Sequence, residues 1–254
     1  MDKVDKIKEL FQAASPDEMP ELIAKYGQDH RRGVQKLVDA AEKRLKLLEK
    51  EKQRIESLRF YEKKYEDYGA ICGVDEAGRG PLAGPVVAGA VILPKNCSIL
   101  YINDSKKLSE KKREELYDVI TEQALAWGVG IVSPARIDEI NILQATYEAM
   151  REAIVKLSVR PGILLNDAVT IPGVDILQIP IVKGDAKSIS IGAASILAKV
   201  TRDRIMRNYD TLFSVYDFGL NKGYGSAGHI EALKKYGPSP IHRRSFIKNF
   251  VTEG

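Results

Sequence analysis

The residues best suited to chemistry are two adjacent carboxylates followed by glycines. Asp75 and Glu76 come at the end of an apolar run, where a charge must be paired or bound to a cation because leaving water is costly. Gly78, Gly80 and Gly84 follow and let the backbone approach a ligand closely, so that amide groups can donate to phosphate or sugar oxygens. The alternative is a charged surface turn in which glycine supplies positive φ.

Two further acidic residues follow apolar runs, Asp167 after residues 163–166 and Asp185 after residues 181–184. Open α/β sheets place their ligands at the carboxyl ends of strands. Four carboxylates that converge from three strand ends would repel one another. Such a cluster is expected chiefly where a hard divalent cation, Mg²⁺ or Mn²⁺, binds. Each has a simpler alternative, a helix N-cap for Asp185 and an Asn-Asp turn for Asp167, and Asp175 competes for the third place.

Short β-rich runs alternate with helical patterns after residue 69. The runs predict strands at residues 70–74, 86–93, 128–132, 163–166 and 176–182. Apolar residues at helical spacing predict long helices over 141–157 and 186–209. Strands first, and then strands alternating with helices, favour an α/β fold with a mixed sheet covered by helices.

The first 68 residues are predicted to be all helical. Ser15 to Glu18 is typical of a capping box that opens a helix ending at Gly27. From residue 37 to 58 apolar side chains recur every three or four positions, which indicates a long amphipathic helix that continues towards residue 67. We therefore expect a helical extension over 1–68 and a catalytic domain over 69–254.

Composition excludes several classes of protein. The 254 residues are 44% hydrophobic and 29% charged, which rules out a disordered chain, a collagen or a disulfide scaffold. The net charge of +4 permits a polyanionic partner without requiring one. The positive charge is unevenly placed, since residues 43–67 hold nine Lys or Arg against six Asp or Glu. The early charges do not fit a signal peptide, the longest uncharged stretch is too short for a membrane helix, and the two cysteines suit neither zinc nor a disulfide framework, so we expect a cytoplasmic protein.

Several motifs occur together in an order that resembles type 2 ribonuclease H, ribonuclease HII. They are Asp75–Pro85 (DEAGRGPLAGP), Asp104–Ser109 (DSKKLS), Lys183–Asp185 (KGD), Ala198–Asp203 (AKVTRD), Gly223–Gly225 (GYG) and the closing Tyr236–Phe246. The resemblance implies a ribonuclease H-like fold. It also implies an endonuclease that hydrolyses the RNA strand of RNA/DNA hybrids and incises duplex DNA on the 5′ side of an embedded ribonucleotide.

The resemblance implies a two-metal mechanism with Mn²⁺ or Mg²⁺, in which one ion activates the attacking water and the other stabilises the leaving 3′ oxygen. The products would carry a 5′-phosphate and a 3′-hydroxyl. The carboxylates that match the metal ligands are Asp75, Glu76, Asp167 and Asp185. Asn166 and Ala168 depart from the family pattern, in which an apolar residue and a glycine are frequent at these positions.

The resemblance also implies the residues that bind substrate. The Gly78-Arg79-Gly80 loop resembles the family's ribose reader, whose backbone contacts the 2′-hydroxyl. Tyr224 resembles the tyrosine that packs on the next sugar and favours an RNA-to-DNA junction. Four cations are expected to neutralise phosphates, with a solvated surface as the alternative: Lys106, Lys107, Lys199 and Arg202.

Two other functions are weighed against this one. Ribonuclease HIII, the sister group, acts on long hybrids, but its glycine loop usually carries Lys between the glycines and an acidic residue after them, so Arg79 and Pro81 favour ribonuclease HII. A non-catalytic scaffold that binds nucleic acid is the third. We expect a monomer whose helical extension adds affinity for the duplex, the alternative being a protein-binding face. His242 is interpreted as structural, because its spacing relates it to no other histidine.

Overall fold

The computed structural model describes residues 2–251 and separates into two compact units, Met1–Glu56 and Ser57–Gly254. Met1 and residues 252–254, which the expected domains include, lie outside the described residues. Each unit is described by itself below. Within residues 2–251, no helix combines the length and the apolar character needed to cross a membrane.

The first unit is built from helices α1 (Val4–Ala13), α2 (Met19–Tyr26) and most of α3 (Arg32–Leu58). Their apolar faces form one core, which includes Ile7, Phe11, Met19, Tyr26, Val34 and Val38. The predicted capping box is confirmed, because the Ser15 amide donates to Glu18 Oε2 at 2.8 Å and the Glu18 amide donates to Ser15 Oγ at 3.4 Å.

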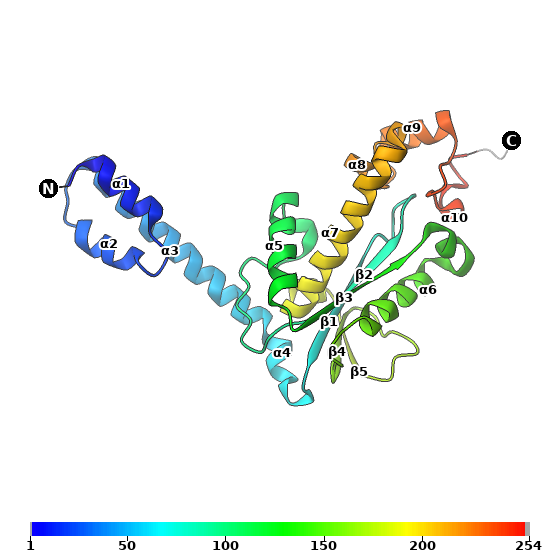
Figure 1. Ribbon diagram of the computed structural model, residues 1–254, viewed down its shortest axis with the longest axis horizontal. Coiled ribbons are helices and arrows are strands. Elements are labelled where there is room, and N and C mark those ends of the chain that lie inside the picture. Colours follow the sequence, from blue (N-terminus) through cyan, green and yellow to red (C-terminus); the bar gives the residue numbers. More distant parts are fainter. Residues whose placement is uncertain (1, 252–254) are drawn as a thin grey trace. The chain divides into compact units, whose positions relative to one another are not determined.

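The second unit contains a five-stranded mixed sheet with helices on both faces (Figure 1). The strands are β1 (Ile71–Ala77), β2 (Val86–Ile92), β3 (Ala126–Val132), β4 (Ile163–Asp167) and β5 (Leu177–Ile181). The helices are α4 (Phe60–Lys64), α5 (Glu110–Gln123), α6 (Pro134–Val155), α7 (Ile189–Leu212), α8 (Phe218–Asn221), α9 (Ala227–Tyr236) and α10 (Arg244–Ile247). Four 3₁₀ turns, η1 (Glu66–Tyr68), η2 (Ser105–Lys107), η3 (Gly184–Ala186) and η4 (Ser214–Tyr216), connect them.

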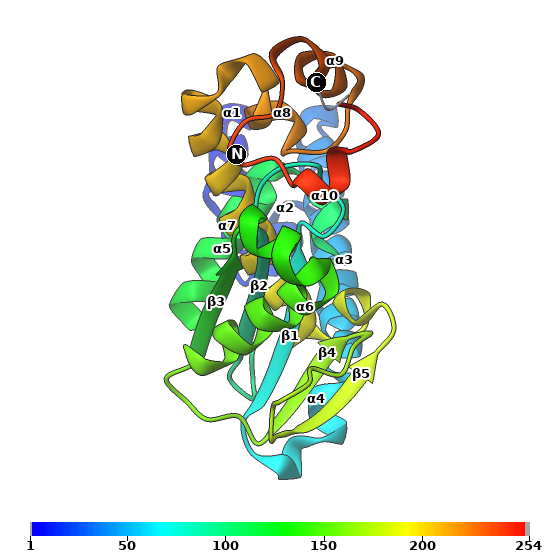
Figure 2. The ribbon, with the colours of Figure 1, turned by 90° about the vertical axis from the view of Figure 1, so that its right-hand side faces the viewer.

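The strand order is β3-β2-β1-β4-β5, with β1 antiparallel to β2 and parallel to β4. Strand glycines bring one long helix close to each face. A Cβ on Gly73 would lie 2.1 Å from the carbonyl carbon of Ser190 in α7, and a Cβ on Gly130 would lie 1.9 Å from the carbonyl oxygen of Ala149 in α6. Figure 2 shows the sheet from a second direction. The predicted α/β class with a mixed sheet is thus confirmed.

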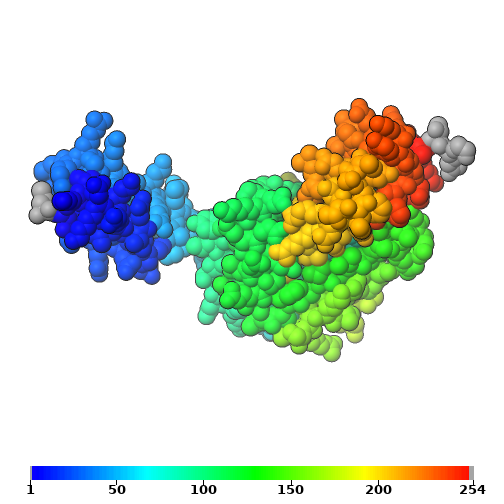
Figure 3. Space-filling model, turned by 45° about the horizontal axis from the view of Figure 1, so that its top comes forward, coloured from blue at the N-terminus to red at the C-terminus, as the bar shows by residue number. Residues whose placement is uncertain are grey.

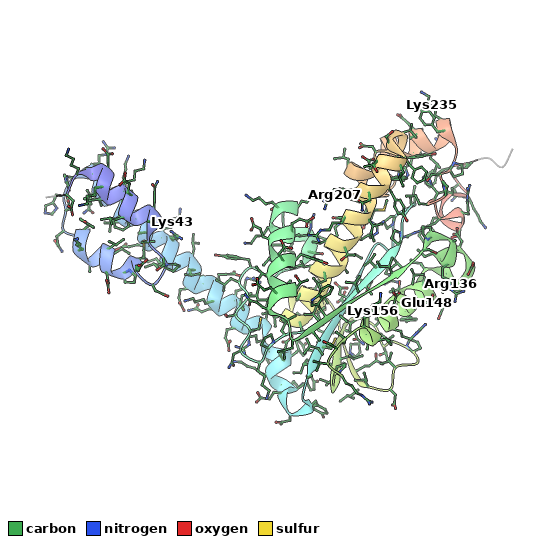
Figure 4. The ribbon with its side chains drawn as sticks, viewed as in Figure 1. Lys43, Arg136, Glu148, Lys156, Arg207 and Lys235 are labelled. Atoms are coloured by element: carbon green, nitrogen blue, oxygen red, sulfur yellow. The ribbon has the colours of Figure 1, made fainter. Side chains whose placement is uncertain are left out.

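The outer edge of β3 is closed by side chains of α6, and by Lys156 directly after it. The Ile131 amide donates to Glu152 Oε2 at 3.0 Å, and Lys156 Nζ donates to the Val129 carbonyl at 2.9 Å. Lys156 and Glu152 also form an ion pair at 2.6 Å. Figure 4 labels Lys156 where α6 ends. Because these two backbone groups are already hydrogen-bonded, they cannot pair with another strand at this edge of the sheet.

Several element boundaries differ from those predicted; helix α6, for example, begins at Pro134 instead of residue 141 and has non-helical backbone at Asn141. Strand β1 continues through Asp75 and Glu76 instead of ending before them, because both residues pair with β2. The predicted long helix ends at Leu58, and α4 and η1 follow as separate short elements. Charge and apolar periodicity were continuous across this break, so they carried no signal for it.

Candidate active site

Asp75 and Glu76 lie inside β1, opposite Gly89 and Ala88 of β2. Because side chains alternate along a strand, Asp75 shares with Gly73 the face that α7 covers. Its side chain is only 5% exposed. Ser195 of α7 hydrogen-bonds to the Asp75 carboxyl. Glu76 is the less buried of the pair and forms an ion pair with Arg79 at 3.3 Å.

Asp167 is the last residue of β4, which runs parallel to β1 with Asn166 opposite Val74. The shared direction brings the carboxyl ends of the two strands to the same edge of the sheet. Asp167 Oδ1 accepts the Gly184 amide at 2.7 Å. This bond ties the end of β4 to η3, the turn that carries Asp185.

Asp185 is the second residue of η3, and the residue before this turn, Lys183, adopts the left-handed backbone conformation. The N-cap of α7 is Ser188, whose hydroxyl accepts the Ile191 amide at 3.3 Å. The alternative that Asp185 serves as the N-cap of this helix is therefore wrong. The Asp185 carboxylate therefore takes no part in capping α7.

The charges of the four acidic residues influence one another. Burial raises the pKa of Asp75 well above its ordinary value, and the charges of Glu76 and Asp167 raise it further. Burial also raises the pKa of Glu76, against the opposing effects of Arg79 and Lys106, with Asp167 again adding to the rise. The pKa of Asp185 is raised by burial and then by the charges of Asp104 and Asp167. The structure thus brings all four predicted carboxylates into one electrostatic cluster.

Asp104 is an acidic neighbour of Asp185 that the sequence did not single out as a candidate, although it opens one of the recognised motifs. Its carboxylate accepts the Lys106 amide at 2.9 Å, which holds η2 beside the cluster. Asp175, the competitor for the third position, is exposed. No charge effect of Asp175 on Asp75, Glu76 or Asp185 is among the principal ones. The structure therefore favours Asp167 over Asp175.

The donor set fits a divalent cation. Carboxylate oxygens are the ligands that Mg²⁺ and Mn²⁺ prefer, and a cation would relieve the mutual repulsion that raises these pKa values. Glu76 Oε2 is buried with no hydrogen-bond partner in the described residues. In the conformation described for residues 2–251, no three His, Cys, Asp or Glu side chains yet form a group that could hold a metal ion.

The glycine loop that follows β1, residues 78–85, is held by two buried arginines. Arg202 of α7 is 1% exposed, and its three guanidinium nitrogens donate to the carbonyls of Pro85, Lys222 and Ala83 at 2.9–3.0 Å. The expectation that Arg202 binds phosphate is corrected by this burial. A buried guanidinium whose three nitrogens each donate to a backbone carbonyl positions the loop instead.

Arg243, which directly precedes α10, is fully buried and holds the other side of this loop. Its guanidinium donates to the carbonyls of Gly78 at 2.5 Å, Arg79 at 2.9 Å, Gly84 at 3.0 Å and Pro85 at 3.2 Å. Burial, followed by the nearby charge of Arg202, lowers the pKa of Arg243 to about 9. The sequence pointed to no role for Arg243, since it is one of four consecutive polar residues in the closing motif, His242 to Ser245.

These bonds determine where the loop amides point. In a trans peptide the N–H and C=O groups point in opposite directions, and no peptide bond within the described residues is cis. Because Arg243 draws the carbonyls of Gly78 and Arg79 inward, the amides of Arg79 and Gly80 face away from it. No hydrogen bond within residues 2–251 uses these two amides. They are thus available to a ligand oxygen.

Tyr224 lies beside this loop. Its side chain is 47% exposed, and a Cβ on Gly80 would lie 4.0 Å from its ring. The Gly223 carbonyl accepts the Leu82 amide at 2.8 Å, which joins the two loops. The Arg202 guanidinium lies 5.9 Å from the centre of the Tyr224 ring. The structure therefore brings the expected ribose reader and the expected sugar-packing tyrosine together.

The three lysines expected at phosphates differ in their surroundings. Lys106 is exposed, and its charge acts on Glu76 and Asp185. Lys107 is exposed in the same turn, η2. Lys199 is largely occupied within the protein, because Nζ donates to the buried Asp203 at 2.8 Å. Of the expected phosphate-binding cations, only Lys106 thus acts on the carboxylates, together with Arg79.

A mixed sheet that carries carboxylates on β1 and at the end of β4, next to α7, defines a ribonuclease H-like protein. Residues 72–249 match the family model Ribonuclease HII, and residues 3–66 match the model Ribonuclease HII N-terminal domain. The chain belongs to the ribonuclease HII family and is a ribonuclease H endonuclease.

Relatives and solved structures agree with this assignment. A ribonuclease HII from Lachnoclostridium phytofermentans is 67% identical over 90% of both chains. One from Clostridioides difficile is 53% identical over 98% of both. The crystal structure of ribonuclease H2 from Pyrococcus horikoshii is 32% identical, with a TM-score of 0.57, and the match covers 69% of this chain and 92% of that one.

Proposed function

We propose that this enzyme hydrolyses the RNA strand of RNA/DNA hybrids and incises duplex DNA on the 5′ side of a single embedded ribonucleotide. The products carry a 5′-phosphate and a 3′-hydroxyl. The proposal is carried by one observation: two of the four clustered carboxylates lie in β1, and the loop directly after this strand has two outward amides and an exposed tyrosine beside it. The cluster suits phosphodiester hydrolysis, and the loop suits recognition of a ribose.

The residues that would hold the metal are Asp75, Glu76, Asp167 and Asp185, with Mn²⁺ or Mg²⁺ as the cation. When bound, the cations supply activation of the attacking water and stabilisation of charge on the leaving oxygen. Asp75 and Glu76 are held by strand pairing, and Asp167 is held by the Gly184 amide. The protein thus provides ligands on a rigid sheet edge, which limits the rearrangement needed on binding.

The recognition of RNA rests on the 2′-hydroxyl, which both donates and accepts hydrogen bonds and is absent from DNA. We assign its recognition to the backbone of Gly78, Arg79 and Gly80. The exposed ring of Tyr224 packs on the sugar of the next nucleotide, where a second 2′-hydroxyl would interfere. Lys106 and Lys107 contact phosphates, which position a duplex without reading its sequence, and Lys199 contributes there only if it releases Asp203.

Cleavage of a defined substrate tests the proposal. We expect incision of a DNA duplex that contains one ribonucleotide, dependent on added Mn²⁺ or Mg²⁺ and abolished by a chelator, with the cut on the 5′ side of the ribonucleotide. A continuous RNA strand paired with DNA serves as the comparison substrate. Cleavage of this hybrid without incision of the single-ribonucleotide duplex would favour the ribonuclease HIII-like alternative.

For the rest of the molecule, we propose that the helical extension over 1–68 adds affinity for the duplex to a catalytic domain over 69–254. The nine basic residues within 43–67 support this role. The enzyme is proposed to act as a monomer in the cytoplasm. Both cysteines, Cys72 and Cys97, are free and buried, as a reducing compartment requires.

Removing residues 1–56 tests the role of the extension, because this cut coincides with the division between the two compact units. We expect weaker binding of the duplex and a flatter dependence of affinity on salt. Each lost phosphate contact should reduce the slope of log K against log salt by about 0.9. Fluorescence anisotropy from 50 to 200 mM salt measures both quantities. An unchanged slope would assign the extension to contacts with protein.

A further inference from the structure

Two histidines outside the carboxylate cluster form a chain of hydrogen bonds that ends on Tyr224. His229 Nδ1 lies 2.8 Å from the Tyr224 carbonyl oxygen, and because a carbonyl only accepts, this nitrogen must carry a hydrogen. At the other end, the Ser239 amide donates to His242 Nδ1 at 3.0 Å. That nitrogen must therefore present a lone pair.

The contact between the two rings then has a single consistent direction. The Nε2 atoms of His229 and His242 are 3.0 Å apart. Since His242 Nδ1 accepts, a neutral His242 carries its hydrogen on Nε2 and donates to His229 Nε2. The chain thus runs from Ser239 through His242 and His229 to Tyr224, with both rings neutral. A proton added to either ring would leave two N–H groups facing each other or remove the acceptor for Ser239.

The surroundings of the pair hold both rings neutral. His229 and His242 are 1% and 2% exposed and pack against the rings of Tyr216 and Phe218. Burial lowers the pKa of both, and that of His242 falls to about 4 with the added effect of His229. The facing groups that titrate or carry charge are the Tyr216 hydroxyl, which donates to the Gly237 carbonyl at 2.6 Å, and Arg244, whose charge also disfavours protonation of His242.

The chain of hydrogen bonds ends at the loop that carries Tyr224, on the surface proposed to contact the substrate. Gly223, with φ of +84°, and Gly225 flank Tyr224, so the loop on either side of it has little intrinsic conformational preference. The Tyr224 carbonyl accepts from the Ser226 amide at 2.8 Å and from His229. The segment after α7, coloured orange to red in Figure 3, carries both histidines, and a bridge between Ala83 and His242 joins it to the glycine loop.

We propose that His229 and His242 are positioning residues that hold the Tyr224 ring beside Gly80, and that the preference for an RNA-to-DNA junction depends on this neutral pair. The proposal rests on the proposed function, since it assigns the pair to the sugar-packing role of Tyr224. It goes beyond that function because neither histidine touches the substrate. Their effect is transmitted through one backbone carbonyl.

The first test compares His229→Leu with His229→Asn. Asparagine can place its Nδ2 donor near the position of the imidazole Nδ1, whereas leucine fills the space without a donor. The readout is the ratio of kcat/KM for the single-ribonucleotide duplex to kcat/KM for a continuous RNA strand in a hybrid. We expect His229→Leu to lower this ratio about 10-fold or more, since small misplacements of a positioning group have effects of this size. His229→Asn should recover most of it.

A double-mutant cycle separates positioning from general stability. Tyr224→Ala is expected to lower the same ratio, and adding His229→Leu to Tyr224→Ala should change it no further. Additive losses, or an unchanged ratio in His229→Leu together with a lower melting temperature, would overturn the positioning role. If the wild-type enzyme does not incise the single-ribonucleotide duplex, the proposed function fails instead, and the two failures are thereby distinguished.

Nitrogen-15 NMR of the wild-type protein tests the hydrogen-bond chain without any variant. At pH 7 we expect His229 protonated on Nδ1 and His242 protonated on Nε2, with both rings neutral. Because unfolded histidine takes up a proton near pH 6.5 and the folded pair resists it, the free energy of unfolding should fall as the pH drops from about 6.5 towards 4. The opposite tautomers, or a charged ring at pH 7, would contradict the proposal.

Discussion

Replacing Asp75 by asparagine is expected to reduce cleavage by about 10³-fold or more while leaving duplex binding intact, a loss of the size seen when a group central to transition-state stabilisation is removed. Asparagine has nearly the shape of aspartate but lacks the charge that a divalent cation requires. The carboxyl is buried between β1 and α7, and the neighbouring Glu76 and Asp167 are proposed as ligands themselves, so neither is free to replace it. Cleavage rates at saturating Mg²⁺ or Mn²⁺ and binding by anisotropy give the two measurements.

The matched control is Asp175→Asn, which removes a carboxylate of the same type at an exposed position. We expect this variant to cleave at the wild-type rate. If Asp75→Asn retains all measurable function, the non-catalytic scaffold becomes the correct interpretation. If Asp175→Asn is the inactive variant, the metal ligands have been assigned to the wrong strand end.

Without metal, the Asp75→Asn protein should be more stable than the wild type, although it is less active. Burial and neighbouring carboxylates raise the pKa of Asp75 in the folded state, so the folded protein binds a proton that the unfolded chain releases near pH 4. Wild-type stability therefore falls as the pH rises above that value. The asparagine variant should unfold at a higher temperature than the wild type, with a larger difference at pH 8 than at pH 4.

The candidate carboxylates could be predicted from the sequence because each follows an apolar run, and sheet geometry brings the ends of strands together. The fold class followed from the same alternation of β-rich and helical patterns. Asp167 was put forward because it follows an apolar run, with Asp175 as its competitor, and the resemblance added weight to Asp167; in the structure Asp167 ends β4 and Asp175 is exposed.

The residues that hold the glycine loop and Tyr224 in place could not be predicted from the sequence, for a physical reason. Arg202 lies on a helix that also carries the partly exposed Lys199, and its burial depends on a loop more than a hundred positions away that folds over α7. Gly78 makes this possible, since a Cβ there would lie 2.1 Å from Arg202 Nε. The histidine pair is similar, because 13 positions separate the two rings and no periodic pattern links them.

The largest loss of stability is expected from Arg243→Ala. The variant leaves the carbonyls of Gly78, Arg79 and Gly84 without their guanidinium donor, whereas the Pro85 carbonyl keeps only its bond from Arg202. It also opens a cavity where the guanidinium packs 5.1 Å from the Phe246 ring. Unsatisfied buried polar groups and lost packing together cost about 3–5 kcal/mol. Urea unfolding measures the change.

Arg243→Lys distinguishes the geometry of the guanidinium from its charge. Lysine keeps the positive charge but presents its donors from a single nitrogen, so it cannot reach four carbonyls on both sides of the loop. We expect Arg243→Lys to recover less than half of the lost stability, and the neighbouring exposed Arg244→Ala to unfold like the wild type. Because Arg243 also turns the amides of Arg79 and Gly80 outward, Arg243→Lys should raise KM for the single-ribonucleotide duplex. A lysine variant with wild-type stability and KM would show that charge alone, without the directed bonds, is sufficient to hold the glycine loop.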